Sequence, residues 1–303
     1  MIKSLALAAT LLLACSPLAA QTPDQLREAF IDEMVSEHGF DRDEVRRTLY
    51  QAHLRKPILE AISRPAERRL NWTEYRDIFL TQSRIDGGVQ FWRDNVEALE
   101  AAERQFGVPP QIIVAILGVE TRYGGFTGGH RVLDALHTLG FHYPRRGPFF
   151  REQLSHFLRF AREEGIDPTY PTGSYAGAMG VPQFMPDSFR IYAIDFDGDG
   201  RRDIWENPRD VIGSVANYFI EKGKWQPGQP VTSPAQGVQG SHQAFLDAGA
   251  RPSLGQGPLI AAGIRSDVLD GSDAKVSLIA LETNNGDEHW VARDNFFAIM
   301  RYN

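Results

Sequence analysis

One carboxylate stands alone in the most apolar helical stretch of the sequence. Glu120 is the only charged residue in the segment 105–121. Two prolines (109–110) are typical of a helix start and two glycines (124–125) of a helix end, so Glu120 falls in the last turn. Burial and the negative end of the helix dipole both raise the pKa of a carboxyl placed there, which suits a general acid near neutral pH. The alternative, which is commoner for an isolated glutamate, is a side chain that reaches solvent or pairs with Arg122.

A glycine-rich segment, residues 173–180, is the second feature that suggests a ligand site. Its small residues let the backbone approach a ligand closely. Ser174 and Gln183 can supply hydrogen bonds at the rim of a groove. Taken alone, the segment is more readily explained as a tight structural turn, and its combination with Glu120 favours the groove.

An acidic loop, residues 195–206, is the third feature. It fits the EF-hand pattern D-x-[DN]-x-[DN]-G-x5-E and predicts a structural Ca²⁺ site. The predicted ligands are Asp195, Asp197, Asp199, the backbone carbonyl of Arg201, Asp203 through water, and Glu206. Arg202 stands where paired EF-hands carry an apolar residue, so we expect a single unpaired loop. An acidic surface turn without metal is the alternative, and no organic cofactor is expected.

Helices must position most of these groups. Apolar residues recur three or four apart over much of the chain, and Asp41 can cap the helix that follows it. Helices are expected at 24–38, 42–54, 89–106, 111–121, 132–139, 149–164 and 211–222. The tail changes character after about Pro230. Residues 276–283 and 289–293, joined by an Asn-Asn-Gly-Asp turn, predict a β-hairpin.

Charge and the N-terminus limit the classes of function. A net charge of -7 and a pI of about 5.6 argue against a general nucleic-acid binder. A short basic start and an apolar run predict a signal peptide over 1–20, too short to span a membrane. Cys15 is the only cysteine, so the exported chain has no disulfide. Residues 12–15 resemble a lipobox, which would give an outer-membrane lipid anchor at Cys15. The alternative is cleavage after Ala20, which the apolar residues after the cysteine favour slightly.

Taken together, these motifs resemble the lytic murein transglycosylase B family. The resemblance covers most of the chain after the predicted signal peptide, and it rests on several motifs that occur in the same order. They are Asn71-Trp72-Thr73-Glu74-Tyr75-Arg76, Phe91-Trp92, Glu120-Thr121-Arg122-Tyr123-Gly124, Tyr143-Pro144-Arg145-Arg146, the segment 173–180, Gln183-Phe184-Met185-Pro186, Asn217-Tyr218-Phe219 and Arg301-Tyr302-Asn303.

The resemblance implies an α+β, mostly helical fold with a lysozyme-like core. An EF-hand-type loop, an extra helical domain and a small antiparallel β portion accompany that core. We therefore expect an N-terminal helical domain over 21–98 and the catalytic core over 99–225. Residues 226–303 are expected to contain the hairpin and to complete the groove.

The resemblance also implies a periplasmic enzyme that acts on the glycan strands and peptide stems of peptidoglycan. It would cleave the β-1,4 bond between N-acetylmuramic acid and N-acetylglucosamine and leave 1,6-anhydromuramic ends. Glu120 matches the family's catalytic glutamate, and the forked guanidinium groups of Arg145 and Arg146 suit the carboxylates of the stem. The other residues matched to substrate binding are Ser174, Gln183, Tyr218, Tyr302, Asn303 and Tyr75. For Tyr218 and Tyr302, a role as core aromatics is equally expected.

Two other functions compete with this prediction. One is a non-catalytic peptidoglycan-binding protein that kept the groove. The other is a hydrolysing muramidase in which Asp134 or Asp187 activates water. Chains of the family usually continue past Arg-Tyr-Asn with a further helix, whereas this sequence stops at Asn303. Either the sequence is truncated or the closing helix is absent, and no protein partner can be named.

Overall fold

Helices make up most of the chain in the computed structural model, which describes residues 21–63 and 70–302. The sheets in this part of the chain are small and antiparallel. The predicted fold class, mostly helical with a small antiparallel β portion, is confirmed. Within the described ranges no helix is both long and apolar enough to cross a lipid bilayer. The predicted signal peptide and Cys15 lie outside the described residues.

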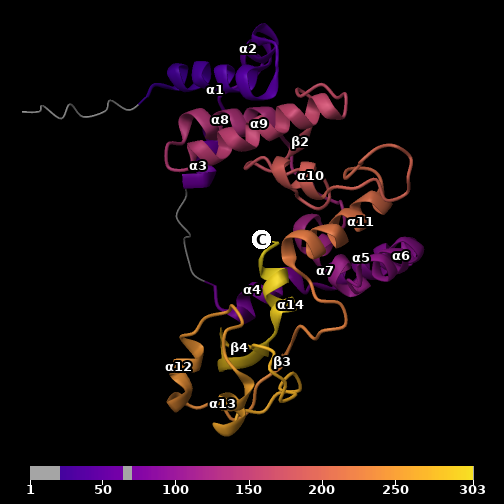
Figure 1. The fold of residues 1–303 in the computed structure, drawn as a ribbon, viewed down its shortest axis with the longest axis vertical. Coiled ribbons are helices and arrows are strands. Elements are labelled where there is room, and N and C mark those ends of the chain that lie inside the picture. The colour runs from indigo at the N-terminus through magenta and orange to yellow at the C-terminus, as the bar shows by residue number, and fades with distance from the viewer. Residues whose placement is uncertain (1–20, 64–69, 303) are drawn as a thin grey trace, which may run out of the picture.

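Five helices form the upper part of the molecule in Figure 1. They are α1 (Pro23–His38), α2 (Arg42–Tyr50), α3 (Lys56–Ser63), α8 (Val132–His142) and α9 (Gly147–Glu163). Asp41 accepts a hydrogen bond from the Glu44 N–H and caps α2, as the sequence predicted. The helix predicted to reach residue 54 ends earlier, because the N–H groups of His53 and Arg55 bind side chains of α8 instead.

Asp134 of α8 is the acceptor that draws this loop away from helical geometry. Its side chain is 1% exposed, and it accepts hydrogen bonds from the His53 N–H at 2.9 Å and from Arg55 Nε at 3.0 Å. Arg131 Nη1 lies 3.4 Å from the same carboxylate. The network joins the N-terminal helices to the helix pair α8 and α9.

We expect Asp134→Ala to lower the free energy of unfolding by about 1–3 kcal/mol, because it removes the acceptor that the His53 N–H and the side chains of Arg55 and Arg131 share. Urea unfolding followed by circular dichroism measures the loss. Asp77→Ala is the matched control, since the Asp77 side chain on α4 is 70% exposed and its substitution should change stability by about 0.5 kcal/mol or less. Equal stabilities for the two variants would contradict the assignment.

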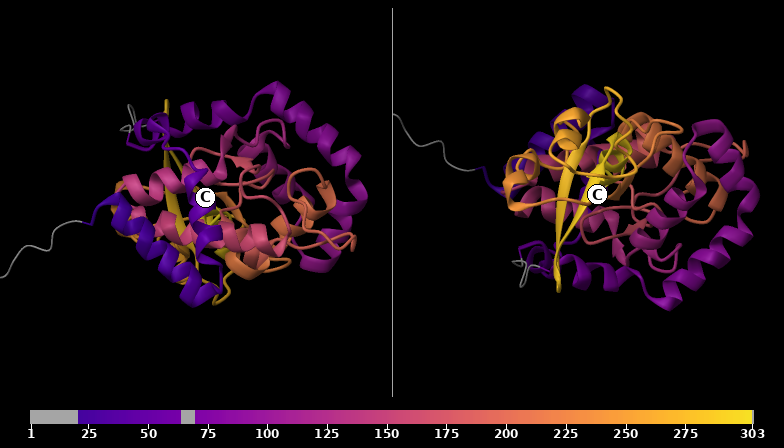
Figure 2. Two further views of the ribbon diagram at one scale, coloured as in Figure 1. Left: turned by 90° about the horizontal axis from the view of Figure 1, so that it is seen from above. Right: turned by 90° about the horizontal axis from the view of Figure 1, so that it is seen from below.

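A second set of helices surrounds the middle of the molecule. They are α4 (Trp72–Phe79), α5 (Gln82–Asp94), α6 (Val96–Phe106), α7 (Pro110–Thr121), α10 (Pro186–Tyr192) and α11 (Pro208–Tyr218). Figure 2 shows α4–α6 as an arc around the outside of the core. The stretch predicted as one helix over 89–106 is two helices that meet at Asn95, whose side-chain Nδ2 donates to the Phe91 carbonyl and ends α5.

The C-terminal part contains a three-stranded sheet in the order β3-β5-β4. Its strands are β3 (Thr232–Pro234), β4 (Ser277–Thr283) and β5 (Gly286–Ala292), and the predicted hairpin is the β4–β5 pair with its turn at Asn284 and Asn285. Shorter elements complete the chain: β1 (His130–Arg131), β2 (Thr172–Gly173), the π-helical turn η1 (Phe219–Gly223), the 3₁₀ turn η2 (Gly240–His242), α12 (Gln243–Leu246), α13 (Gln256–Ala261) and α14 (Asp294–Met300). The sequence analysis missed β3, which is only three residues long.

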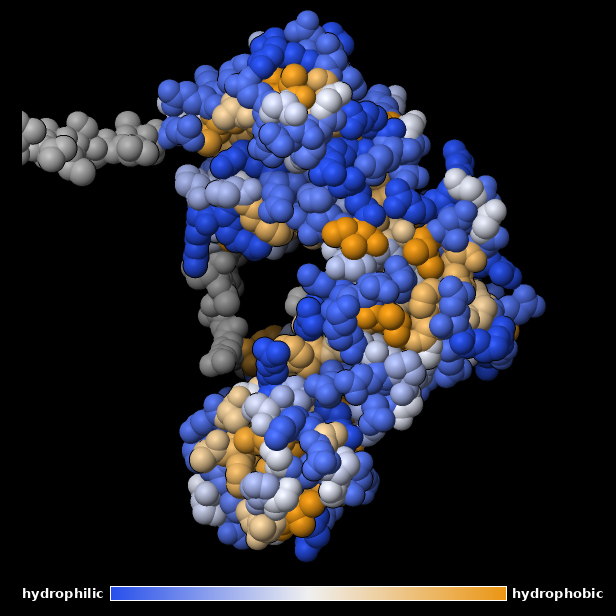
Figure 3. Space-filling view, in the orientation of Figure 1, coloured by the Kyte–Doolittle hydropathy of each residue, from blue (hydrophilic) through white to orange (hydrophobic). Residues whose placement is uncertain are grey.

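Two apolar clusters form the core. One runs continuously from Phe30 to Ala298, and a smaller one lies under the sheet, with Leu259, Val276 and Val291 among its members. The first cluster crosses the predicted boundary between residues 98 and 99, so the division of the chain into domains stays a prediction. The space-filling view shows a hollow between the part that carries α3, α8 and α9 and the C-terminal part (Figure 3). Helix α14 returns from the sheet to the middle of the molecule (Figure 1).

Candidate active site

Glu120 lies one residue before the end of α7, in the last turn as predicted. Its Oε1 atom is buried and has no hydrogen-bond partner among the described residues. Burial raises the pKa of the Glu120 carboxyl to about 7. The alternative pairing with Arg122 does not occur in the described part of the chain. A carboxyl in this state holds its proton near neutral pH and can donate it to a ligand.

The glycine-rich segment packs against α8, and Val181, which directly follows it, is bonded to the end of α7. Thr121 Oγ1 donates this hydrogen bond to the Val181 carbonyl at 2.8 Å, and it connects the end of α7 to the residue after the segment. A Cβ on Gly177 would lie 2.5 Å from Leu136 Cδ2, and one on Gly180 would lie 2.6 Å from the Ile204 carbonyl oxygen. Packing within the protein therefore requires these two glycines. This agrees with the alternative given in the sequence analysis, a tight structural turn, rather than with close approach of a ligand.

Ser174 and Gln183 both stabilise this segment through backbone contacts. Ser174 Oγ accepts a hydrogen bond from the Ala178 N–H at 3.0 Å. Gln183 has a left-handed backbone (φ 54°), and its Nε2 donates to the carbonyls of Thr127 and Gly180 at 3.0 and 2.9 Å. The amide nitrogen of Gln183 is thus engaged by the protein, and its carbonyl oxygen is the group that remains for a ligand.

A group of aromatic rings closes the inner side of the site. The rings of Tyr218 and Tyr302 lie 4.8 Å apart, and Phe184 lies 5.5 Å from Tyr218. The Tyr302 hydroxyl donates to the Pro182 carbonyl and the Tyr218 hydroxyl to the Arg301 carbonyl, each at 3.0 Å. Burial raises the pKa of Tyr218 to about 12, and burial followed by the nearby Glu120 charge raises that of Tyr302. Tyr302 is therefore a neighbour of Glu120, and both tyrosines also serve as core aromatics.

The acidic loop brings four carboxylates together. Oxygens of Asp195, Asp197, Asp199 and Asp210 all lie within 4.8 Å of one another. Asp210, in the first turn of α11, was missed by the sequence analysis because it lies beyond the EF-hand pattern. It is buried and accepts the N–H groups of Phe196 and Asp203 at 2.7 and 2.8 Å. Hard carboxylate oxygens at this density fit a calcium ion.

Asp203, Glu206 and Arg201 take other places in the same loop. The Asp203 carboxylate accepts the N–H groups of Trp205 and Glu206 at 2.8 and 2.9 Å, which forms a turn. Neither Asp203 nor Glu206 belongs to the group of four carboxylates. The Arg201 N–H donates to Asp199 at 2.9 Å. Their role as ligands stays a prediction.

Sequence comparison decides the family. Residues 22–303 match the family described as the transglycosylase SLT domain. The chain belongs to this family.

Three related transglycosylases show how far the likeness extends. The membrane-bound lytic murein transglycosylase B of Escherichia coli (strain K12) is 41% identical over 285 residues, which cover 91% of this chain and 77% of that protein. The crystal structure of soluble lytic transglycosylase SltB1 from Pseudomonas aeruginosa matches with a TM-score of 0.87 and 48% identity over 92% of both chains. Escherichia coli Slt35 in complex with calcium matches with a TM-score of 0.82 and 40% identity, over 92% of this chain and 87% of that one.

These findings confirm the predicted family, the predicted lysozyme-like fold and the predicted enzyme class. This transglycosylase is a peptidoglycan lytic enzyme, and the non-catalytic and hydrolytic alternatives are less well supported.

The remaining predicted residues of the transglycosylase lie on other elements. Arg145 and Arg146 are exposed in the turn between α8 and α9, and the Arg146 guanidinium lies 4.5 Å from the Phe149 ring. Tyr75 of α4 is 47% exposed and lines a hollow of about 380 Å³ between α4 and β4. Among the described residues, no hydrogen bond or ring contact joins these side chains to Glu120. Asn303 lies outside the described residues.

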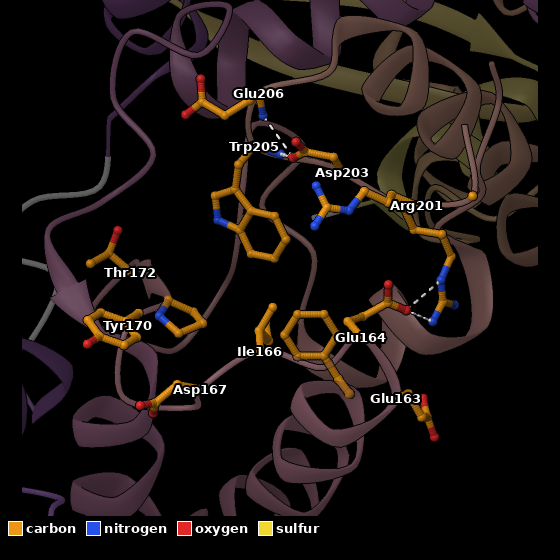
Figure 4. Close-up of a pocket in the computed structure, with 14 residues that line it drawn as sticks. Glu163, Glu164, Ile166, Asp167, Tyr170, Thr172, Arg201, Asp203, Trp205 and Glu206 are labelled. Atoms are coloured by element: carbon orange, nitrogen blue, oxygen red, sulfur yellow. Dashed lines mark hydrogen bonds and ion pairs between the residues drawn. The ribbon is translucent and has the colours of Figure 1, made fainter. Parts of the chain in front are cut away.

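A larger hollow of about 780 Å³ lies between the end of α9 and the acidic loop (Figure 4). Trp205 points into it, and Glu164 on one wall forms an ion pair with Arg202. Its walls come from segments that are about 35 residues apart in the chain, so the sequence analysis could not find it. None of the predicted sugar-binding residues of the transglycosylase lines it.

Proposed function

We propose that Glu120 alone carries the transglycosylase reaction on peptidoglycan, as an acid in the first step and as a base in the second. The observation that supports this role is a buried carboxyl oxygen without a partner on a group whose pKa is raised to about 7. A group with that pKa is well matched to both proton transfers near neutral pH.

The two steps conserve the proton. Protonated Glu120 donates to the glycosidic oxygen as the bond between that oxygen and the anomeric carbon of N-acetylmuramic acid breaks. The N-acetyl group of the same sugar stabilises the positive charge that develops. The Glu120 carboxylate then takes the proton of the C6 hydroxyl, whose oxygen bonds to the anomeric carbon. Attack within one sugar has a large effective molarity, so no water is consumed and a 1,6-anhydro ring forms.

A hydrolase would need a second carboxylate to activate water. Asp134 is buried and bound by two arginines and a backbone N–H. Asp187 Oδ1 accepts the Ser188 N–H at 2.6 Å at the start of α10. Asp134 is committed to these contacts and one oxygen of Asp187 to the start of α10, so we favour the route with one carboxylate.

The substrate-binding residues belong to this proposal. Ser174, Gln183, Tyr218 and Tyr302 are proposed to contact the sugars next to the cleaved bond. The exposed guanidinium groups of Arg145 and Arg146 would bind carboxylates of the peptide stem. Tyr75 and Asn303 are proposed to extend the groove.

We further propose that the acidic loop binds a structural calcium ion. Carboxylates of Asp195, Asp197, Asp199 and Asp210 support it, because four such groups within 4.8 Å repel one another unless a cation lies between them. Arg201, Asp203 and Glu206 are proposed as further ligands. The calcium complex of Slt35 is consistent with this assignment.

The proposed location is the periplasm, where peptidoglycan is accessible. The predicted signal peptide supports export, and the relative from Escherichia coli is named as membrane-bound. Lipid attachment at Cys15 is the proposed route for an anchored form, and cleavage after Ala20 would give a soluble one.

Mass spectrometry of digested peptidoglycan tests the proposed reaction. We expect muropeptides that end in 1,6-anhydromuramic acid, which are lighter by one water than hydrolysed products, because the attacking hydroxyl belongs to the cleaved sugar. A digest in H₂¹⁸O serves as the control and should incorporate no label. Labelled reducing ends would contradict the proposal and favour a hydrolase.

A further inference from the structure

We propose that Tyr123 is a positioning residue that orients Glu120 by filling a socket formed by Gly87, Gly88 and Gly118. The inference rests on the proposed role of Glu120 as acid and base. In this proposal, the turn that follows Glu120 and the contact between helices α5 and α7 determine the orientation of its carboxyl group.

The direction of the Glu120 carboxyl must be set by its backbone. Among the described residues, its buried Oε1 has no hydrogen-bond partner and no ion pair holds the group. Because the carboxyl is left free to bind a ligand, no hydrogen bond from another side chain holds its orientation. The position of the last turn of α7 therefore decides where the proton is presented.

The backbone after Glu120 adopts an uncommon conformation. Arg122 and Tyr123 both have left-handed backbones, with φ of 54° and 60°. A left-handed backbone is unfavourable for any residue other than glycine. Two such residues in succession persist only where surrounding contacts enforce the conformation. The Tyr123 N–H bonds to the Leu117 carbonyl at 3.0 Å, so the chain turns back over the helix end. This turn carries the Tyr123 ring back against α7 and α5.

The glycine socket fits the returning ring closely. A Cβ on Gly118 would lie 2.5 Å from the Tyr123 hydroxyl oxygen and 2.7 Å from Cζ, and one on Gly88 would lie 2.6 Å from the same oxygen. A Cβ on Gly87 would lie 3.2 Å from Cε2. Real Cβ atoms are essentially never found at the three distances below 3.0 Å. All three glycines lie inside helices, where glycine is unfavourable, so their presence is explained by the space that the ring occupies.

Hydrogen bonds lock the ring between the two helices. The Tyr123 hydroxyl donates to the Arg84 carbonyl at 2.9 Å, and Arg84 Nη1 donates to the Gly118 carbonyl at 2.9 Å. The Phe91 ring stacks on the Tyr123 ring at 5.7 Å. Gly118 is two residues before Glu120, and Thr121 on its other side bonds to Val181. The catalytic turn is thus held from both sides, by α5 through Tyr123 and by Val181 through Thr121.

Gly118→Ala is the main test. We expect a loss of kcat of about 10–100-fold on soluble peptidoglycan strands, because the added methyl displaces the ring and with it the last turn of α7. KM should change by about two-fold or less, since the sugar-contacting residues are untouched. Gly257→Ala is the matched control: this helical glycine has no atom within 4 Å of an added Cβ and should keep full activity.

The pH profile separates orientation from general loss of structure. The kcat/KM of the wild-type enzyme should fall as the pH rises through about 7, because Glu120 must be protonated to donate. If the turn shifts in Gly118→Ala, water reaches the carboxyl, its pKa falls and the decline moves to lower pH. A loss of activity caused only by partial unfolding would leave the position of this decline unchanged and would overturn the proposal.

Two variants of Tyr123 complete the test. Tyr123→Phe keeps the ring and removes the bond to Arg84, so a drop in kcat of about five-fold is expected. In a Tyr123→Ala background, Gly118→Ala should add less than about a two-fold effect, because the ring it collides with is gone. Additive losses would overturn the proposal.

If Glu120→Gln is inactive while Gly118→Ala and Tyr123→Phe retain wild-type kcat and pH profile, only the positioning role fails. An active Glu120→Gln enzyme would remove the proposed function itself.

Discussion

Replacing Glu120 by glutamine should lower the turnover of peptidoglycan by roughly 10²–10⁴-fold while leaving the protein folded. Glutamine has nearly the same shape but can neither give a proton to the glycosidic oxygen nor take one from the C6 hydroxyl, and one acid–base group contributes about this factor. Release of anhydro-muropeptides measures the rate. The matched control is Glu103→Gln on α6, where an exposed glutamate carries the same chemical change away from the site.

The stability of the same variant gives an independent check. Burial raises the pKa of Glu120 in the folded protein to about 7, above its value in an unfolded chain. Ionisation of Glu120 therefore opposes folding, and the wild-type protein loses stability as the pH rises from about 4.5 through 7. The glutamine variant lacks this loss, so its advantage in melting temperature should be greater at pH 8 than at pH 5. Two outcomes would contradict the assignment of Glu120. One is a Glu120→Gln enzyme that stays active, and the other is a Glu120→Gln protein that melts at a lower temperature than the wild type at pH 8.

Local signals in the sequence were sufficient for several parts of the structure. Pro109 and Pro110 at the start of α7 and the two glycines shortly beyond its end predicted the place of Glu120 in its last turn. Asp41 capped α2 as expected, and the Asn-Asn-Gly turn joined β4 to β5. In each of these cases the decisive contacts are made by residues close together in the chain.

The features that the sequence did not reveal depend on contacts between distant segments. Helix α2 ends early because Asp134, about 80 residues later, accepts the N–H of His53. Asp210 joins the acidic group from the helix that follows the loop, outside the pattern used to find it. Gly118, which no sequence pattern singles out, is explained by the ring of Tyr123 that packs against it. Sequence patterns record local geometry, whereas these residues are explained by what lies opposite them.

Calcium is expected to raise the melting temperature of the metal-free protein by about 5–10 °C. A ligand at one hundred times its dissociation constant stabilises a folded protein by about 2.7 kcal/mol, and each kcal/mol corresponds to about 2–4 °C in a chain of this size. The physical reason is the repulsion among Asp195, Asp197, Asp199 and Asp210, which the ion removes. Differential scanning calorimetry with EDTA and then with excess Ca²⁺ measures the shift.

Asp197→Asn should abolish most of this shift without lowering the stability of the metal-free protein. The Asp197 side chain is exposed, and an asparagine oxygen can still accept the hydrogen bond from Asn207 Nδ2. Removing one negative charge from the group also relieves part of its repulsion. Asp273→Asn, an exposed aspartate outside the loop, is the matched control and should respond to Ca²⁺ as the wild type does. Calcium titrations of Asp210→Asn and Glu206→Gln then show whether Asp210 of α11 or Glu206 of the loop closes the site. A melting temperature that does not respond to Ca²⁺ in the wild-type protein would show that the acidic loop is a surface turn without a metal.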